Sequence, residues 1–165
     1  MAVGGMRTAK QLAQAIVERL CEQGKTVTFA ESCTGGLTAA TLVSVSGASN
    51  VFREGYLTYC DESKRDLLGV SQESLTAHTA VSESVALEMA DGARVKAKAD
   101  YAISVTGYAD GEVDQAGHVF VGFAGWDEAD RDLSYEVLEL RLTGDRNTVR
   151  KKAVYRALKF LWERL

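Results

Sequence analysis

The chain has 165 residues, 46% of them hydrophobic and 25% charged, which is ordinary for a globular domain with its own core. Its formal net charge of −4 argues against broad binding to nucleic acid or to an anionic membrane, because both favour a basic surface. No apolar run approaches the roughly 20 residues that span a bilayer, and the N-terminus lacks a signal-peptide pattern. We therefore expect one cytoplasmic domain over residues 1–165, with a short disordered lead at residues 1–7.

Helices and strands alternate along the first half of the chain. Apolar residues at three- and four-residue spacing predict a helix from about Thr8 to Gln23, with Gly24 as its C-cap. The next predicted elements are a strand at Thr26–Ala30, a helix at Ser32–Val45, a strand at Phe52–Tyr59 and a short helix at Asp61–Leu68.

The second half continues this alternation. A capping pattern predicts a helix from Ser82 to about Lys96, and the apolar run Tyr101–Thr106 is typical of a buried central strand. The remaining elements are strands at His118–Ala124 and Leu133–Leu142, joined by an acidic turn at Asp127–Asp132, and a last helix capped by Thr143–Asp145. This order predicts the α/β class, as a three-layer α/β/α domain around a mostly parallel, mixed sheet of about five strands.

A reactive side chain stands where the first strand is expected to pass into a helix. The segment Glu31–Gly36 reads Glu-Ser-Cys-Thr-Gly-Gly and holds two possible nucleophiles, Ser32 and Cys33. The N–H groups and macrodipole at a helix start suit an anion or a developing oxyanion, and glycines let a substrate approach the backbone. We expect Cys33 to be a small buried packing residue, although a thiol at a helix start can also be reactive.

Lys64 is the candidate base for Ser32. A serine hydroxyl needs a base, and a lysine whose pKa is lowered by burial or by nearby positive charge meets that need. Both residues follow strand ends, so they are expected to meet at the carboxyl edge of the sheet, with Tyr59 as proton relay or orienting group. The alternative is that Ser32 caps a helix, Lys64 is a solvated surface lysine and Tyr59 packs within a strand.

Other candidates carry weaker signals. Thr106 and Gly107 end a strand and open a Gly- and Asp-rich loop that either presents N–H groups to a ligand or is plain surface. Arg146 follows a helix cap and is either a phosphate ligand or a surface residue. Cys21 and Cys60 are expected to pack in the interior, and neither the cysteines nor the histidines have the spacing of a metal site.

Several segments together resemble the CinA C-terminal domain family, whose characterised members are nicotinamide-nucleotide amidohydrolases. Ala30–Gly36 resembles the family signature, and the similarity extends over nearly the whole chain, from about Ala9 to Leu161. Further similar segments follow in the expected order at Ser46–Phe52, Thr58–Lys64, Leu68–Val70, His78–Ser82, Ser104–Gly107 and Gly144–Arg146.

The resemblance implies hydrolysis of the carboxamide of nicotinamide mononucleotide to nicotinic acid mononucleotide and ammonia, in pyridine nucleotide salvage. It implies Ser32 as nucleophile, Lys64 as base and Tyr59 in proton handling, without a metal or organic cofactor. The implied substrate contacts are Cys33, Thr34, Gly35 and Gly36 through their N–H groups, with Thr106, Gly107 and Arg146, the last for the phosphate. The implied partners are a small-molecule nucleotide and a second copy of the chain in a homodimer, without nucleic acid or membrane.

The chain departs from the family pattern in three places. Loop Tyr108–Gly117 is shorter, lacks proline and carries added acids that would repel a substrate phosphate. Asp61 replaces an asparagine and would raise the pKa of the neighbouring lysine, and Thr79 replaces a glycine. Two alternatives therefore stay open: a catalytically impaired paralogue acting as a nucleotide-binding or interaction module, and an amidohydrolase of a different small amide.

Overall fold

The computed structural model describes residues 8–127 and 132–165. Residues 1–7, for which we expected disorder, and residues 128–131, in the expected acidic turn, lie outside the described residues. Within the described ranges, no helix is both long and apolar enough to cross a bilayer.

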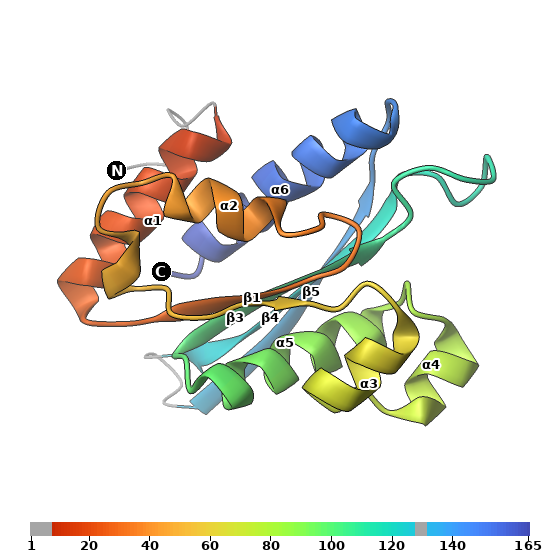
Figure 1. Cartoon of the computed structure of the whole chain (residues 1–165), viewed down its shortest axis with the longest axis horizontal. Coiled ribbons are helices and arrows are strands. Elements are labelled where there is room, and N and C mark those ends of the chain that lie inside the picture. Colours follow the sequence, from red (N-terminus) through yellow and green to blue (C-terminus); the bar gives the residue numbers. More distant parts are fainter. Residues whose placement is uncertain (1–7, 128–131) are drawn as a thin grey trace.

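Five strands form one open sheet in the order β2-β1-β3-β4-β5 (Figure 1). β1 pairs in parallel with β2 and β3, whereas β4 pairs antiparallel with β3 and β5. Four strands therefore run in one direction and β4 alone opposes them, which confirms the mostly parallel, mixed sheet. The strands are β1 (Val27–Glu31), β2 (Tyr56–Leu57), β3 (Tyr101–Gly107), β4 (His118–Asp127) and β5 (Asp132–Arg141).

Helices cover both faces of this sheet, as Figure 1 shows. One layer holds α1 (Ala9–Gln23), α2 (Leu37–Val43) and α6 (Arg146–Trp162), with a 3-10 turn, η2, at Ala48–Asn50. The other layer holds α3 (Asp61–Leu68), α4 (Gln72–His78) and α5 (Glu83–Ala97). The predicted three-layer α/β/α architecture is thus confirmed.

Each face of the sheet has its own hydrophobic core. The larger core joins the sheet to α1 and α6 and includes Leu12, Phe29, Ile103 and Leu158. The smaller core lies under α3, α4 and α5. β3 runs between the two, and its first six residues are all buried, as the apolar run predicted. This burial anchors the carboxyl ends of β1 and β3, where the candidate residues lie.

Two predicted elements are shorter in the structure. α2 begins at Leu37 rather than Ser32, because Gly35 and Gly36 have φ values of 60° and 87° that a right-handed helix does not contain. β2 spans only two residues instead of Phe52–Tyr59, since its pairing with β1 is confined to Tyr56 and Leu57. Cys21 and Cys60 are exposed, so the prediction that both pack in the interior was wrong.

Candidate active site

Ser32 lies on a tight turn at the carboxyl edge of the sheet. It directly follows β1, and its N–H donates to the carbonyl of Val105 on β3 at 2.9 Å. The N–H of Gly35 donates back to the carbonyl of Ser32 at 3.0 Å. The residue is therefore held by the turn and by the neighbouring strand. It does not cap α2, because the N-cap position belongs to Gly36.

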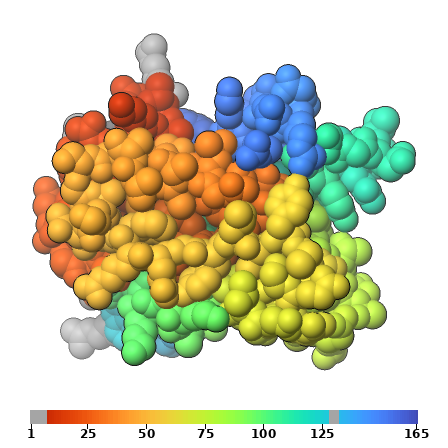
Figure 2. Space-filling model, viewed as in Figure 1, coloured from red at the N-terminus to blue at the C-terminus, as the bar shows by residue number. Residues whose placement is uncertain are grey.

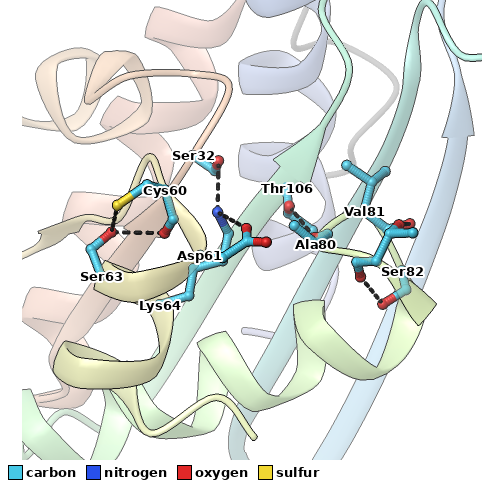
Figure 3. A network of polar contacts seen from close by, with 10 residues as sticks. Ser32, Cys60, Asp61, Ser63, Lys64, Ala80, Val81, Ser82 and Thr106 are labelled. Atoms are coloured by element: carbon cyan, nitrogen blue, oxygen red, sulfur yellow. Dashed lines mark hydrogen bonds and ion pairs between the residues drawn. The ribbon is translucent and has the colours of Figure 1, made fainter. Parts of the chain in front are cut away.

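Lys64 reaches Ser32 from the other helical layer. Its side chain is buried on α3, and Nζ donates to Oγ of Ser32 at 3.3 Å (Figure 3). Burial lowers the pKa of Lys64, while the carboxylate of Asp61, 3.9 Å from Nζ, acts in the opposite direction. Desolvation is the larger effect, and it shifts Lys64 toward the neutral amine that a base requires. The interpretation of Lys64 as a solvated surface residue was wrong.

Tyr59 and Arg146 meet at the rim of the site rather than beside the serine. The Tyr59 side chain is exposed, and its hydroxyl accepts a hydrogen bond from Nη2 of Arg146 at 2.8 Å. Nη1 of the same guanidinium lies 2.5 Å from Oδ1 of Asp110. Figure 2 shows the loop that carries Asp110 (teal) projecting beside the start of α6 (blue). One arginine thus bridges the tyrosine and that loop.

A pocket of about 240 Å³ connects these groups. It brings together seven of the ten predicted site residues: Ser32, Cys33, Tyr59, Lys64, Thr106, Gly107 and Arg146. Thr34, Gly35 and Gly36 are not among its lining residues, because the turn directs them toward α2 and α6. Asp61, Ala80, Val81, Tyr108, Ala109 and Asp110 complete the wall.

Cys33 and Thr106 have different surroundings from Ser32, although all three line the pocket. Burial raises the pKa of the Cys33 thiol to about 11, so this side chain stays protonated near neutral pH and is a poor nucleophile. The Thr106 hydroxyl donates to the carbonyl of Ala80 at 2.6 Å and holds that segment against β3 (Figure 3). Within this pocket, Ser32 is thus the more suitable nucleophile.

Glu31 has a structural role that was not predicted from the sequence. The residue is only 2% exposed, and its carboxylate accepts hydrogen bonds from the N–H groups of Thr38 at 3.0 Å and Ala39 at 2.8 Å. It therefore caps α2 from the end of the preceding strand. Because Glu31 occupies this helix start, the expected anion site at the N-terminus of α2 is already filled by the protein itself. The available signal was an acid immediately before Ser32.

Arg150 was also missed, and it joins the turn that carries Ser32 to α6. Its Nε donates to the carbonyl of Cys33 at 3.0 Å, and its Nη2 donates to the carbonyl of Thr34 at 2.9 Å. A third bond runs from Nη1 to Oδ1 of Asn147 at 3.0 Å. Arg150 follows Arg146 by four residues, so both lie on one face of α6. The four-residue spacing of these two arginines was the sequence feature that could have identified Arg150 as part of the site.

The fold and this pocket define a three-layer α/β/α protein that pairs a serine hydroxyl with a buried lysine at the carboxyl edge of its sheet. Its sequence matches the profile of the CinA C-terminal domain over residues 9–165. The chain belongs to the CinA C-terminal domain family.

Its similarity to known proteins extends over the whole domain. The chain is 41% identical to the nicotinamide-nucleotide amidohydrolase PncC of Escherichia coli (strain K12), over 93% of this chain and 92% of that protein. A solved CinA superfamily protein from Escherichia coli superposes with a TM-score of 0.86 at 36% identity and covers 100% of this chain and 94% of its own. The competence/damage inducible protein CihA from Agrobacterium tumefaciens superposes with a TM-score of 0.85 at 34% sequence identity. The match covers 98% of this chain and 97% of that protein.

Proposed function

We propose that the protein is a serine amidohydrolase that converts nicotinamide mononucleotide to nicotinic acid mononucleotide and ammonia. The observation that carries the proposal is the 3.3 Å contact between Lys64 Nζ and Ser32 Oγ. This contact occurs in a chain similar over nearly its full length to a nicotinamide-nucleotide amidohydrolase. It supplies both parts that cleavage of a carboxamide needs, a nucleophile and a base.

The reaction runs through an acyl-enzyme. Neutral Lys64 takes the hydroxyl proton of Ser32 while Oγ attacks the carboxamide carbon, forming a tetrahedral intermediate. The ammonium group of Lys64 then protonates the leaving nitrogen, the C–N bond breaks and ammonia departs. Lys64, neutral again, removes a proton from a water that attacks the ester. Collapse of the second intermediate returns the proton to Oγ and releases the carboxylate product.

The turn supplies a donor for the oxyanion. The N–H groups of Ser32 and Gly35 are already used, by Val105 and by Ser32 itself. We assign the oxyanion to the N–H group of Cys33, which lines the pocket next to Ser32 and whose own carbonyl is held by Arg150. Donors fixed before the reaction stabilise developing charge without reorganising, which is why such a turn favours catalysis.

The rim of the pocket suits the remainder of the nucleotide. The guanidinium of Arg146 presents paired donors to a phosphate, as arginine does at many phosphate sites. The Tyr59 hydroxyl, held by the same guanidinium, assists proton handling between the dyad and solvent. Thr106 and Gly107 form the wall beside Ser32. The steps require no metal or organic cofactor, since the dyad provides both acid and base.

The wider context of the reaction stays a prediction. The proposal implies pyridine nucleotide salvage in the cytoplasm, and a homodimer is expected from the family resemblance. The comparisons favour an active enzyme over the alternative of a binding or interaction module, because the similarity to PncC is close and covers the full domain. Hydrolysis of a different small amide is an outcome that the same assay detects with a substrate panel.

The test is ammonia release from nicotinamide mononucleotide by the purified chain. Ser32→Ala and Lys64→Ala should each abolish measurable turnover. The matched controls are Ser44→Ala, at the exposed C-cap of α2, and Lys159→Ala, at a half-buried position of α6; both lie away from the pocket and should retain activity. Absence of release at high enzyme concentration contradicts the proposal, as does release that Ser32→Ala leaves unchanged. Thermal stabilisation by the nucleotide without product indicates the binding module instead.

A further inference from the structure

The guanidinium of Arg146 is already occupied by groups of the chain itself. Nη1 lies 2.5 Å from Oδ1 of Asp110, and Nη2 donates to the Tyr59 hydroxyl at 2.8 Å. All three residues line the pocket that contains Ser32 and Lys64. A carboxylate thus stands where the proposed phosphate ligand presents its donors.

We propose that Asp110 is a specificity-determining residue that competes with the substrate phosphate for Arg146. This inference rests on the proposed function. Carboxylate and phosphate bind the same planar donors of a guanidinium, so one ligand must move when the other arrives. A phosphate that remains near Asp110 is also repelled by the carboxylate charge. Asp110 therefore weakens binding of phosphorylated substrates, whereas substrates without a phosphate do not compete with it for Arg146.

The exposure of the pair makes this competition a modest one. The side chains of Arg146 and Asp110 are 46% and 59% exposed, and exposed ion pairs contribute little to stability. The pair can therefore open when a phosphate arrives. Asp110 reduces the preference for a nucleotide over the corresponding nucleoside and does not block the site.

The same loop offers a matched control. Glu112 lies two residues from Asp110 and carries the same charge, but the described contacts of Arg146 are with Asp110 and Tyr59 and not with Glu112. Glu112→Gln therefore removes one negative charge from the loop without releasing the guanidinium. Asp110→Asn removes the same charge and also weakens the pair.

The experiment compares steady-state kinetics of the wild type, Asp110→Asn and Glu112→Gln on nicotinamide mononucleotide and on the corresponding nucleoside. For Asp110→Asn, KM for the nucleotide should fall about 3- to 10-fold at low ionic strength, with kcat unchanged and no effect on the nucleoside. Glu112→Gln should stay within about twofold of the wild type because its charge is more distant. Added salt should reduce the difference between Asp110→Asn and the wild type.

A second measurement keeps the inference independent of turnover. Inorganic phosphate should bind Asp110→Asn more tightly than the wild type by calorimetry, and Asp110→Ser should behave in the same way. If the wild type releases no ammonia, the proposed function fails and phosphate affinity alone decides the role of Asp110. Unchanged phosphate affinity in both variants overturns the inference. The inference is also overturned if Asp110→Asn changes KM for the nucleoside as much as KM for the nucleotide. The same holds if Glu112→Gln lowers KM for the nucleotide as much as Asp110→Asn does.

Discussion

Replacing Glu31 by alanine should destabilise the protein by about 3 kcal/mol. The residue is 2% exposed, and its carboxylate accepts hydrogen bonds from the N–H groups of Thr38 and Ala39. Hydrogen bonds to a charged group contribute about 1.5–3 kcal/mol each, so two give about 3–6 kcal/mol. Removing the buried charge recovers part of this loss, which moves the expectation to the lower end. That loss is a large share of the about 5–15 kcal/mol by which domains are stable.

Glu31→Gln is the informative comparison, because it keeps the size of the side chain and one acceptor oxygen. One of the two N–H groups stays satisfied, so the cost should be about half that of Glu31→Ala. The free energy of unfolding is measured by urea denaturation, with the m-value checked for constancy. A cost below about 1 kcal/mol for Glu31→Ala, or equal costs for both variants, refutes the assignment of Glu31 as the cap of α2.

Three further outcomes follow from the site and its surroundings. Burial lowers the pKa of Lys64, so the rate of ammonia release should fall as the pH drops through that pKa. The carboxylate of Asp61 raises the pKa of Lys64, so Asp61→Asn should move the acidic limb of the pH–rate profile to lower pH. Arg150→Ala should lower kcat on the order of tenfold with little change in KM, and Arg150→Lys should restore only part, because lysine lacks the fork that holds two carbonyls at once. Thr79→Gly should raise stability by about 1 kcal/mol in thermal unfolding, since Thr79 has φ 65° and ψ 166°, where strain of about 1–3 kcal/mol exceeds the entropic cost of glycine.

Each of these three expectations has an opposing result. An unshifted acidic limb in Asp61→Asn contradicts the coupling of that carboxylate to Lys64. Full recovery of kcat by Arg150→Lys contradicts the two-carbonyl arrangement, and a rise in KM alone places Arg150 in substrate binding. A loss of stability in Thr79→Gly indicates that the threonine side chain contributes more than its backbone conformation costs.

The fold and the approximate position of the site were predictable from local patterns. The apolar run Tyr101–Thr106 identified β3 because a strand buried on both faces has no polar alternation. The Glu-Ser-Cys-Thr-Gly-Gly segment located the turn that carries Ser32, since two adjacent glycines permit a conformation that other residues avoid. Both signals depend on neighbouring residues only, so a single sequence carries them.

Local residue patterns were thus enough to predict the order of the elements, the α/β class and the residues able to react. Which of these residues meet depends on how the chain packs in three dimensions. Lys64 and Ser32 lie 32 positions apart and on different layers, and their 3.3 Å contact arises because α3 follows β2, the strand beside β1, and packs against α5. The same applies to Glu31, Arg150 and Asp110. Their side chains pair with groups brought close by folding, and residue type alone does not reveal whether a charge faces solvent, a helix end or another charge.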